Sequence, residues 1–136
     1  MSYKYSELKI GDSERFSKTI TAADILLFAA VSGDMNQLHI NEEFGKTTRF
    51  GHRIAHGMLT AALIPAALTS AFPGSVYISQ FVKFTAPVYE GDTITAEVVC
   101  KEKREKNHVI MQTNCYNQDG VCVLEGEAET KLAKES

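Results

Sequence analysis

The second half of the chain alternates apolar and polar residues in twos. Four such runs cover residues 75–89, 92–103, 108–118 and 121–132. A period of two is typical of strands that bury one face of a sheet. Turn residues separate the runs, namely Gly91-Asp92, Lys106-Asn107 and Asp119-Gly120. The last pair is typical of a type I′ hairpin turn. The pattern predicts a long antiparallel sheet.

Two stretches of the first half have helical patterns instead. Residues 21–33 begin with a Thr-x-x-Asp sequence that resembles a capping box, and they end at Gly33. Residues 56–72 are apolar on almost every side, which predicts a helix surrounded by protein rather than one on a surface. Pro65 lies inside this second run. It either bends the helix or marks the place where a first helical segment ends.

The remaining residues complete the order of elements. A short strand is expected over residues 15–20, and residues 34–55 read as an irregular overhang with one helical turn at 42–46. The simplest way to bury an apolar helix is to wrap the sheet around it. We therefore predict an α+β fold, a single hot-dog domain over residues 1–136. Its antiparallel sheet wraps around a long central helix, and the overhang carries the active site.

Composition narrows the possible partners and the compartment. The 136 residues are 44% hydrophobic, enough for one core, and the net charge of -3 is spread without a basic face, so nucleic acid is not expected as a partner. Neither a signal peptide nor an apolar run of the ~18 residues needed to span a membrane is found. The three cysteines lack metal-type spacing and read as reduced, packed thiols. These features predict a soluble, cytoplasmic protein.

The candidate chemistry lies around Asp34 and His39, followed by Gly57 at the head of the apolar helix. On a regular helix, side chains five residues apart point about 140° away from each other, since there are ~3.6 residues per turn. Asp34 and His39 therefore converge only if a turn separates them, and Gly33 and Asn36 permit such a turn.

The sequence around these residues resembles the MaoC-like (R)-specific enoyl-CoA hydratases, also called hydratase 2, which have the hot-dog fold. The family motif Gly-Asp-x-Asn-Pro-Leu-His is matched by the following residues: Gly33, Asp34, Asn36, Leu38 and His39. Further matches are Thr47, Thr48, Phe50, His56, Gly57 and Met58, and then Phe84, Pro87, Val88, Gly91 and Asp92. The resemblance covers nearly the whole chain.

The resemblance implies addition of water to a trans-2-enoyl-CoA to give the (R)-3-hydroxyacyl-CoA, a lyase reaction of fatty acid metabolism. Asp34 and His39 would be the catalytic pair, and the Gly57 N–H would face the enolate that develops on the thioester oxygen. Asn36 would help to fix the substrate or the water. Coenzyme A enters as part of the substrate, and no other cofactor is expected. Which member of the pair acts as the base is left open.

Two positions depart from the family pattern, and two rival functions follow from the same fold. Gln37 replaces the usual proline, and Pro65 stands where the family often has a serine that supports the pair. One rival is an acyl-CoA thioesterase, which needs a carboxylate on the central helix, and residues 56–72 contain none. The other rival is a non-catalytic acyl-CoA binding domain. The intact Asp34, His39 and Gly57 argue against it.

Other candidates have weaker support from the sequence. His56 is expected to cap the helix or contact the overhang, His52 and His108 to be solvated turn residues, and no metal site is predicted from these spacings. Four cations could meet coenzyme A phosphates, but no phosphate site is assigned: Lys83, Lys103, Arg104 and Lys106. The acyl pocket is expected beside Met35, Leu59 and Leu63. An unpaired edge of the sheet predicts a homodimer or an assembly of dimers.

Overall fold

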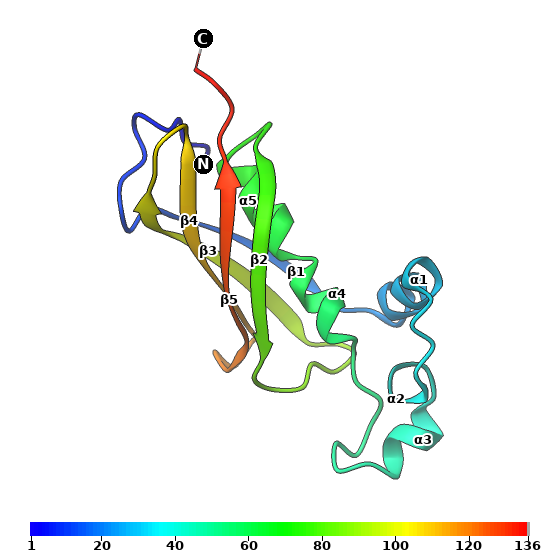
Figure 1. Cartoon of the computed structure of the whole chain (residues 1–136). Helices are drawn as coiled ribbons and strands as arrows, with labels where there is room; N and C mark the ends of the chain where they lie inside the picture. The colour runs from blue at the N-terminus through cyan, green and yellow to red at the C-terminus, as the bar shows by residue number, and fades with distance from the viewer. Residues whose placement is uncertain (136) are drawn as a thin grey trace.

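A computed structural model describes residues 1–135 and contains one five-stranded antiparallel sheet with helices against it (Figure 1). The strands are β1 (Ser13–Thr19), β2 (Val76–Phe84), β3 (Thr93–Lys103), β4 (His108–Tyr116) and β5 (Cys122–Lys131). Their order across the sheet is β1-β3-β4-β5-β2, so β1 and β2 form its two edges. This architecture confirms the predicted α+β hot-dog fold.

The strands alternate as their sequences predict. Along β3, every second side chain is fully buried, namely Ile94, Ala96, Val98 and Cys100. They face the central helical region, whose buried residues Ile64, Ala67, Leu68 and Ala71 recur at helical spacing. The core is therefore one layer of side chains between the sheet and this region.

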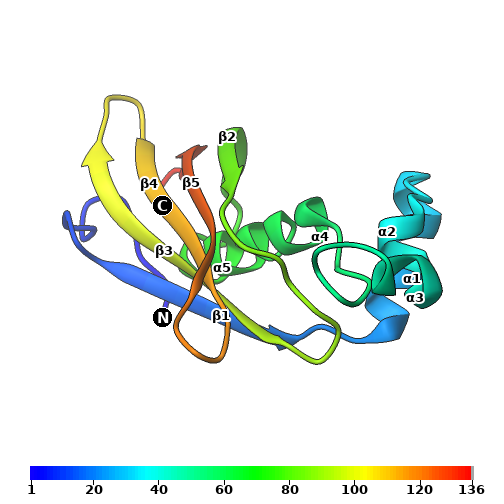
Figure 2. The ribbon, with the colours of Figure 1, turned by 90° about the horizontal axis from the view of Figure 1, so that it is seen from below.

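The central helix is divided in two. It consists of α4 (Gly57–Ala61) and α5 (Ile64–Ala71), which lie one after the other along the same face of the sheet (Figure 2). The continuous helix expected over residues 56–72 is therefore wrong, and the alternative of an early end to the first segment is confirmed. Pro65 stands in the first turn of α5. Its missing N–H removes no helical hydrogen bond at that position, because the first N–H groups of a helix have no partner within it.

The overhang extends beyond one end of the sheet (Figures 1 and 2). It follows α1 (Ala22–Ser32), whose capping box at Thr21 and Asp24 is present as predicted. It contains α3 (Glu42–Lys46), at the predicted helical turn, and a second short helix that the sequence did not reveal, α2 (Gln37–Ile40). Four residues are too few to show a helical period in the sequence.

The turn type predicted for one of the hairpins differs in the structure. The type I′ turn lies at Lys106-Asn107, where both φ angles are positive, 60° and 63°. At Asp119-Gly120 only the glycine has a positive φ, 76°, and the Asn117 N–H donates to the Val121 carbonyl in a longer loop. The type I′ prediction for Asp119-Gly120 is wrong, because a third loop residue relieves Asp119 of the left-handed conformation.

Three further observations concern the chain as a whole. Cys100, Cys115 and Cys122 are free thiols. Burial raises the pKa of the Cys115 thiol to about 12. In the described part of the chain, no helix combines the length and the apolar character that crossing a membrane requires.

Candidate active site

Asp34 lies on the turn that follows α1. Gly33 ends this helix in the left-handed conformation, with φ 80°. The Asp34 N–H donates to the Ser32 hydroxyl at 3.1 Å, and the Asn36 N–H donates to one Asp34 carboxylate oxygen at 3.2 Å. The second of these bonds engages one carboxylate oxygen, and within residues 1–135 the other oxygen accepts no hydrogen bond.

His39 lies on α2, which Asn36 caps by accepting the Leu38 N–H at 3.0 Å. Its Nδ1 atom is 2.8 Å from the Ile54 carbonyl oxygen. A carbonyl can only accept a hydrogen bond, so Nδ1 carries the proton. The Nε2 atom of the neutral ring therefore has a free lone pair, as a general base requires.

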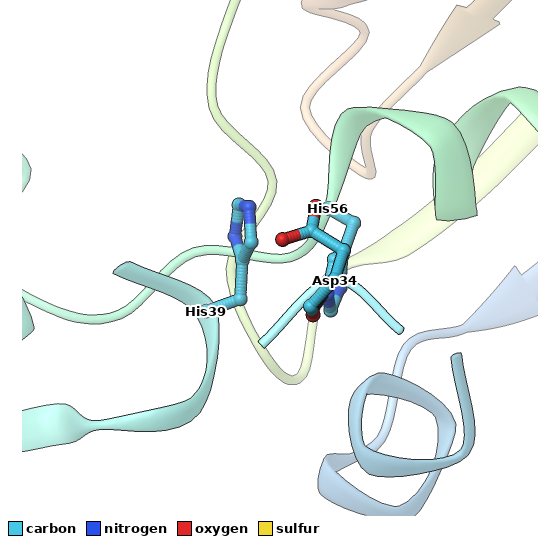
Figure 3. Close-up of side chains that lie close together, drawn as sticks. All are labelled: Asp34, His39 and His56. Carbon is cyan, nitrogen blue, oxygen red and sulfur yellow. Dashed lines mark hydrogen bonds between the residues drawn. The ribbon is translucent and has the colours of Figure 1, made fainter. Parts of the chain in front are cut away.

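The turn brings the two predicted catalytic residues together. One carboxylate oxygen of Asp34 and one nitrogen from each of His39 and His56 lie within 4.8 Å of one another. Figure 3 shows an oxygen of the Asp34 carboxylate directed toward the His39 ring, whereas Asp34 and His56 overlap in this view. The convergence of Asp34 and His39 across a turn is thus confirmed as geometry. Their catalytic roles remain a proposal.

The pair opens into a cavity of about 710 Å³. The overhang and α4 form one part of its wall, and the end of β2, the chain that follows it and Val123 of β5 form the rest. Its lining residues include Asp34, His39, Arg49, Phe50, His56, Gly57, Met58, Thr60, Phe84, Pro87 and Tyr89. Met35, Leu59 and Leu63 are not among them. The acyl pocket expected beside those three residues is therefore placed wrongly, since Leu59 and Leu63 belong to the core.

Gly57 is the first residue of α4, and it lies against Phe84 in β2. A β-carbon on Gly57 would stand 2.7 Å from Cε1 of the Phe84 ring, closer than atoms in contact can approach. Within residues 1–135, the Gly57 N–H has no backbone acceptor, as expected for the first turn of a helix. The Gly57 N–H, a hydrogen-bond donor, and the Phe84 ring thus lie next to each other in the cavity lining.

The two departures from the family pattern lie away from the cavity lining. Gln37 begins α2, and its side-chain oxygen accepts from the Asn41 amide at 2.9 Å. The turn before α2 is held by the capping bonds of Asp34 and Asn36, so it does not depend on a proline.

Asn36 itself does not line the cavity, and its side-chain oxygen accepts the capping hydrogen bond of α2.

The arrangement of the two imidazoles does not suit a metal ion, although three potential ligands are close. The rings of His39 and His56 stack, with centroids 4.1 Å apart and planes inclined by 30°. Imidazole lone pairs lie in the ring plane, so stacked rings cannot both direct a nitrogen at one ion. The geometry favours proton transfer.

Sequence reasoning missed the side of the cavity formed by the chain after β2, together with Arg49. Arg49 is the one Lys or Arg among the lining residues, and no ion pair engages it within residues 1–135. Its guanidinium lies 4.8 Å from the centroid of the Phe50 ring. The four cations named from the sequence do not line the cavity. The Lys103 ammonium, for example, donates to the carbonyls of Tyr5 and Leu8.

Known proteins resemble this chain in sequence and in fold. The family model described as "MaoC like domain" matches residues 7–120. The (R)-specific enoyl-CoA hydratase of Rhodospirillum rubrum is 46% identical over 127 residues, which cover 91% of this chain and 88% of the relative. The 3-hydroxybutyryl-CoA dehydratase of Methylorubrum extorquens is 41% identical over 133 residues, covering 96% and 84%. The unliganded R-hydratase PhaJ1 from Pseudomonas aeruginosa superposes with a TM-score of 0.91 at 44% identity, covering 96% of this chain and 86% of that one.

Proposed function

The chain belongs to the MaoC-like domain family, and from this membership we propose that it is an (R)-specific enoyl-CoA hydratase. The enzyme adds water to a trans-2-enoyl-CoA and forms the (R)-3-hydroxyacyl-CoA. The observation that carries the proposal is the convergence of Asp34 and His39 at the cavity, with the free Gly57 N–H among the same lining residues.

The pair provides two acceptors for one water molecule. The free carboxylate oxygen of Asp34 and the Nε2 lone pair of His39 each accept one of its O–H groups, which leaves an oxygen lone pair to attack C3 of the substrate. The new C–O bond forms as the C2–C3 double bond shifts toward the thioester. One water proton passes to the pair, and the pair delivers a proton to C2.

The charge that develops on the thioester oxygen needs a hydrogen-bond donor. The Gly57 N–H has this role in the proposed mechanism, because it is unpaired and the glycine exposes its backbone to the cavity. Asn36 contributes indirectly, by capping the short helix that carries His39. No cofactor is proposed, since proton transfer and charge stabilisation are supplied by the chain itself.

Neither rival function gains support from the cavity. Thioester hydrolysis on this fold would need a carboxylate on the central helix, and in the described structure Asp34 is the one Asp or Glu that lines the cavity. A mere binding domain would not require Asp34 and His39 to converge. Hydration is therefore the function that the residues support best.

The finer proposals concern substrate contacts, assembly and compartment. Arg49 is proposed to bind a phosphate of coenzyme A, because it is an exposed, unpaired cation at the cavity.

A homodimer is proposed through the edge strand β2, where several large apolar side chains are exposed: Val76, Tyr77, Ile78, Phe81 and Phe84. Three free cysteines support a reducing compartment, and we propose the cytoplasm.

Mixing the purified protein with crotonyl-CoA tests the proposed reaction. The absorbance of the conjugated thioester is expected to fall, and chiral analysis of the product is expected to give the (R)-3-hydroxy compound. A series of short and medium acyl chains should be included, since the acyl preference is not assigned. Absence of reaction with all of them, or an (S) product, would contradict the proposal.

A further inference from the structure

His56 is a buried histidine whose side chain the proposed mechanism does not use. It is 1% exposed, and its Nε2 atom lies 3.0 Å from the main-chain oxygen of Asp34. Because a carbonyl oxygen only accepts, the ring is protonated on Nε2. The Nδ1 atom is buried without a hydrogen-bond partner in the described structure.

Of the two roles expected of His56, the contact with the overhang is present, through the bond to Asp34, and the capping bond is not. His56 is the N-cap residue of α4, yet its side chain makes no capping hydrogen bond. A purely apolar ring would fill the same space without leaving a buried nitrogen unpaired. The feature that an apolar ring could not provide is the Nε2–H bond to Asp34.

Two other rings also lie close to the His56 ring. His39 stacks on it with ring centroids 4.1 Å apart, and the Phe28 ring lies with its centroid at 4.9 Å. His56 thus touches both members of the catalytic pair, one by a hydrogen bond and the other by stacking. It also directly precedes Gly57 in the chain, so the same residue adjoins the proposed enolate donor.

We infer that His56 is a positioning residue that holds the Asp34 turn and the His39 ring in fixed relation to the start of α4. This inference rests on the proposed function. Loss of the Nε2–H bond frees the Asp34 turn, and loss of the ring removes the surface on which His39 stacks. Either change alters the geometry of the water between Asp34 and His39, so kcat falls while substrate binding is retained.

Two substitutions separate the two contacts. His56→Phe keeps a ring and loses the donor, whereas His56→Gln keeps an N–H donor and loses the ring. We expect His56→Phe to lower kcat with crotonyl-CoA by roughly 10²-fold, the scale of a small misplacement of catalytic groups, with little change in KM. His56→Gln is expected to retain more activity than His56→Phe. The control is His52→Phe, because His52 is exposed and lies outside the cavity lining, and it should match the parent.

Comparison of single and double variants shows whether His56 affects kcat through the pair of Asp34 and His39. If His56 acts through the pair, His56→Phe causes no further loss in a His39→Ala background, because the pair is already broken. An equal fold-loss in both backgrounds, or a parental kcat for His56→Phe alone, would overturn the inference. Thermal unfolding midpoints show whether each variant is folded. Should His56→Phe fail to fold, His56→Gln in both backgrounds provides the same comparison.

A measurement on the parent protein is independent of activity. Heteronuclear NMR of the imidazole nitrogens should show His56 protonated on Nε2, as the bond to Asp34 requires. Protonation on Nδ1 alone would overturn the inference. If the parent hydrates no thioester, the proposed function fails, but the NMR result still decides whether His56 makes the predicted hydrogen bond.

Discussion

The Phe84 ring lies so close to Gly57 that a β-carbon on Gly57 would stand 2.7 Å from its Cε1 atom. The contact joins β2 to the first residue of α4, beside the catalytic pair. Phe84 is half exposed, so its ring has room to move outward, into the space where substrate is proposed to bind.

Gly57→Ala is therefore expected to raise KM for crotonyl-CoA with little loss of stability. The alanine keeps the N–H that faces the enolate, so the defect comes from the displaced ring. The double variant Gly57→Ala/Phe84→Ala should recover part of the loss, as measured by steady-state kinetics. Equal KM values for the single variant and the parent would show that the cavity at Gly57 is not used by substrate.

Asp34→Asn and His39→Ala should each lower kcat by roughly 10²–10⁴-fold, the range typical of general acid–base groups. The Asp34→Asn side chain still accepts the Asn36 N–H, so the turn is expected to persist. Circular dichroism and unfolding midpoints check the fold. Turnover within tenfold of the parent in either variant would move the active site elsewhere.

Arg49→Ala should raise KM for crotonyl-CoA, because the variant lacks the cation proposed to contact a phosphate. The same variant should be unaffected with crotonyl-N-acetylcysteamine, a thioester without phosphates. Lys134→Ala is the matched control, since it removes one positive charge from an exposed position outside the cavity lining. A similar change in KM for both thioesters would contradict a phosphate contact.

Phe81→Lys should convert a dimer to a monomer in sedimentation experiments. Phe81 is 64% exposed on β2, and a lysine on an edge strand opposes pairing with another strand. Val121→Lys, at an exposed apolar position between β4 and β5, is the matched control and should leave the mass unchanged. A parent protein that sediments as a monomer would refute the proposed assembly.

Cys100 and Cys115 should resist iodoacetamide at pH 8 in the folded protein. Burial raises the pKa of both thiols, to about 12 for Cys115, so the reactive thiolate is scarce. Unfolding returns each thiol to its ordinary pKa of about 8.5 and makes it reactive. Mass spectrometry with and without denaturant measures the difference. Rapid labelling of Cys115 in the native protein would contradict its burial.

The sequence predicts features that depend on near neighbours in the chain more accurately than contacts between distant segments. Strand alternation and the capping box at Thr21 depend on near neighbours in the chain, and both were confirmed. The convergence of Asp34 and His39 was expected because the motif and Gly33 together implied a turn. The sequence does not decide between a bend and a break before α5, because Pro65 is compatible with either a bend within one helix or the first turn of a new one.

The features that the sequence did not reveal are contacts between distant segments. The Phe84 ring meets Gly57 only because β2 returns beside α4. Arg49 reaches the cavity because the overhang folds back on the domain. The contact of His56 with the overhang agrees with one of its two expected roles, but its partner Asp34, 22 residues earlier in the chain, is not evident from the sequence. No local periodicity reports such contacts.

Strand β2 contributes both to the cavity and to the proposed dimer interface. One end of this strand supplies Phe84 to the substrate cavity, and the same strand exposes the apolar side chains proposed to pair with a second copy. We therefore expect association along β2 to be linked to substrate binding. Specific activity should fall when the enzyme is diluted below the dissociation constant of the dimer, and saturating substrate should shift that constant downward.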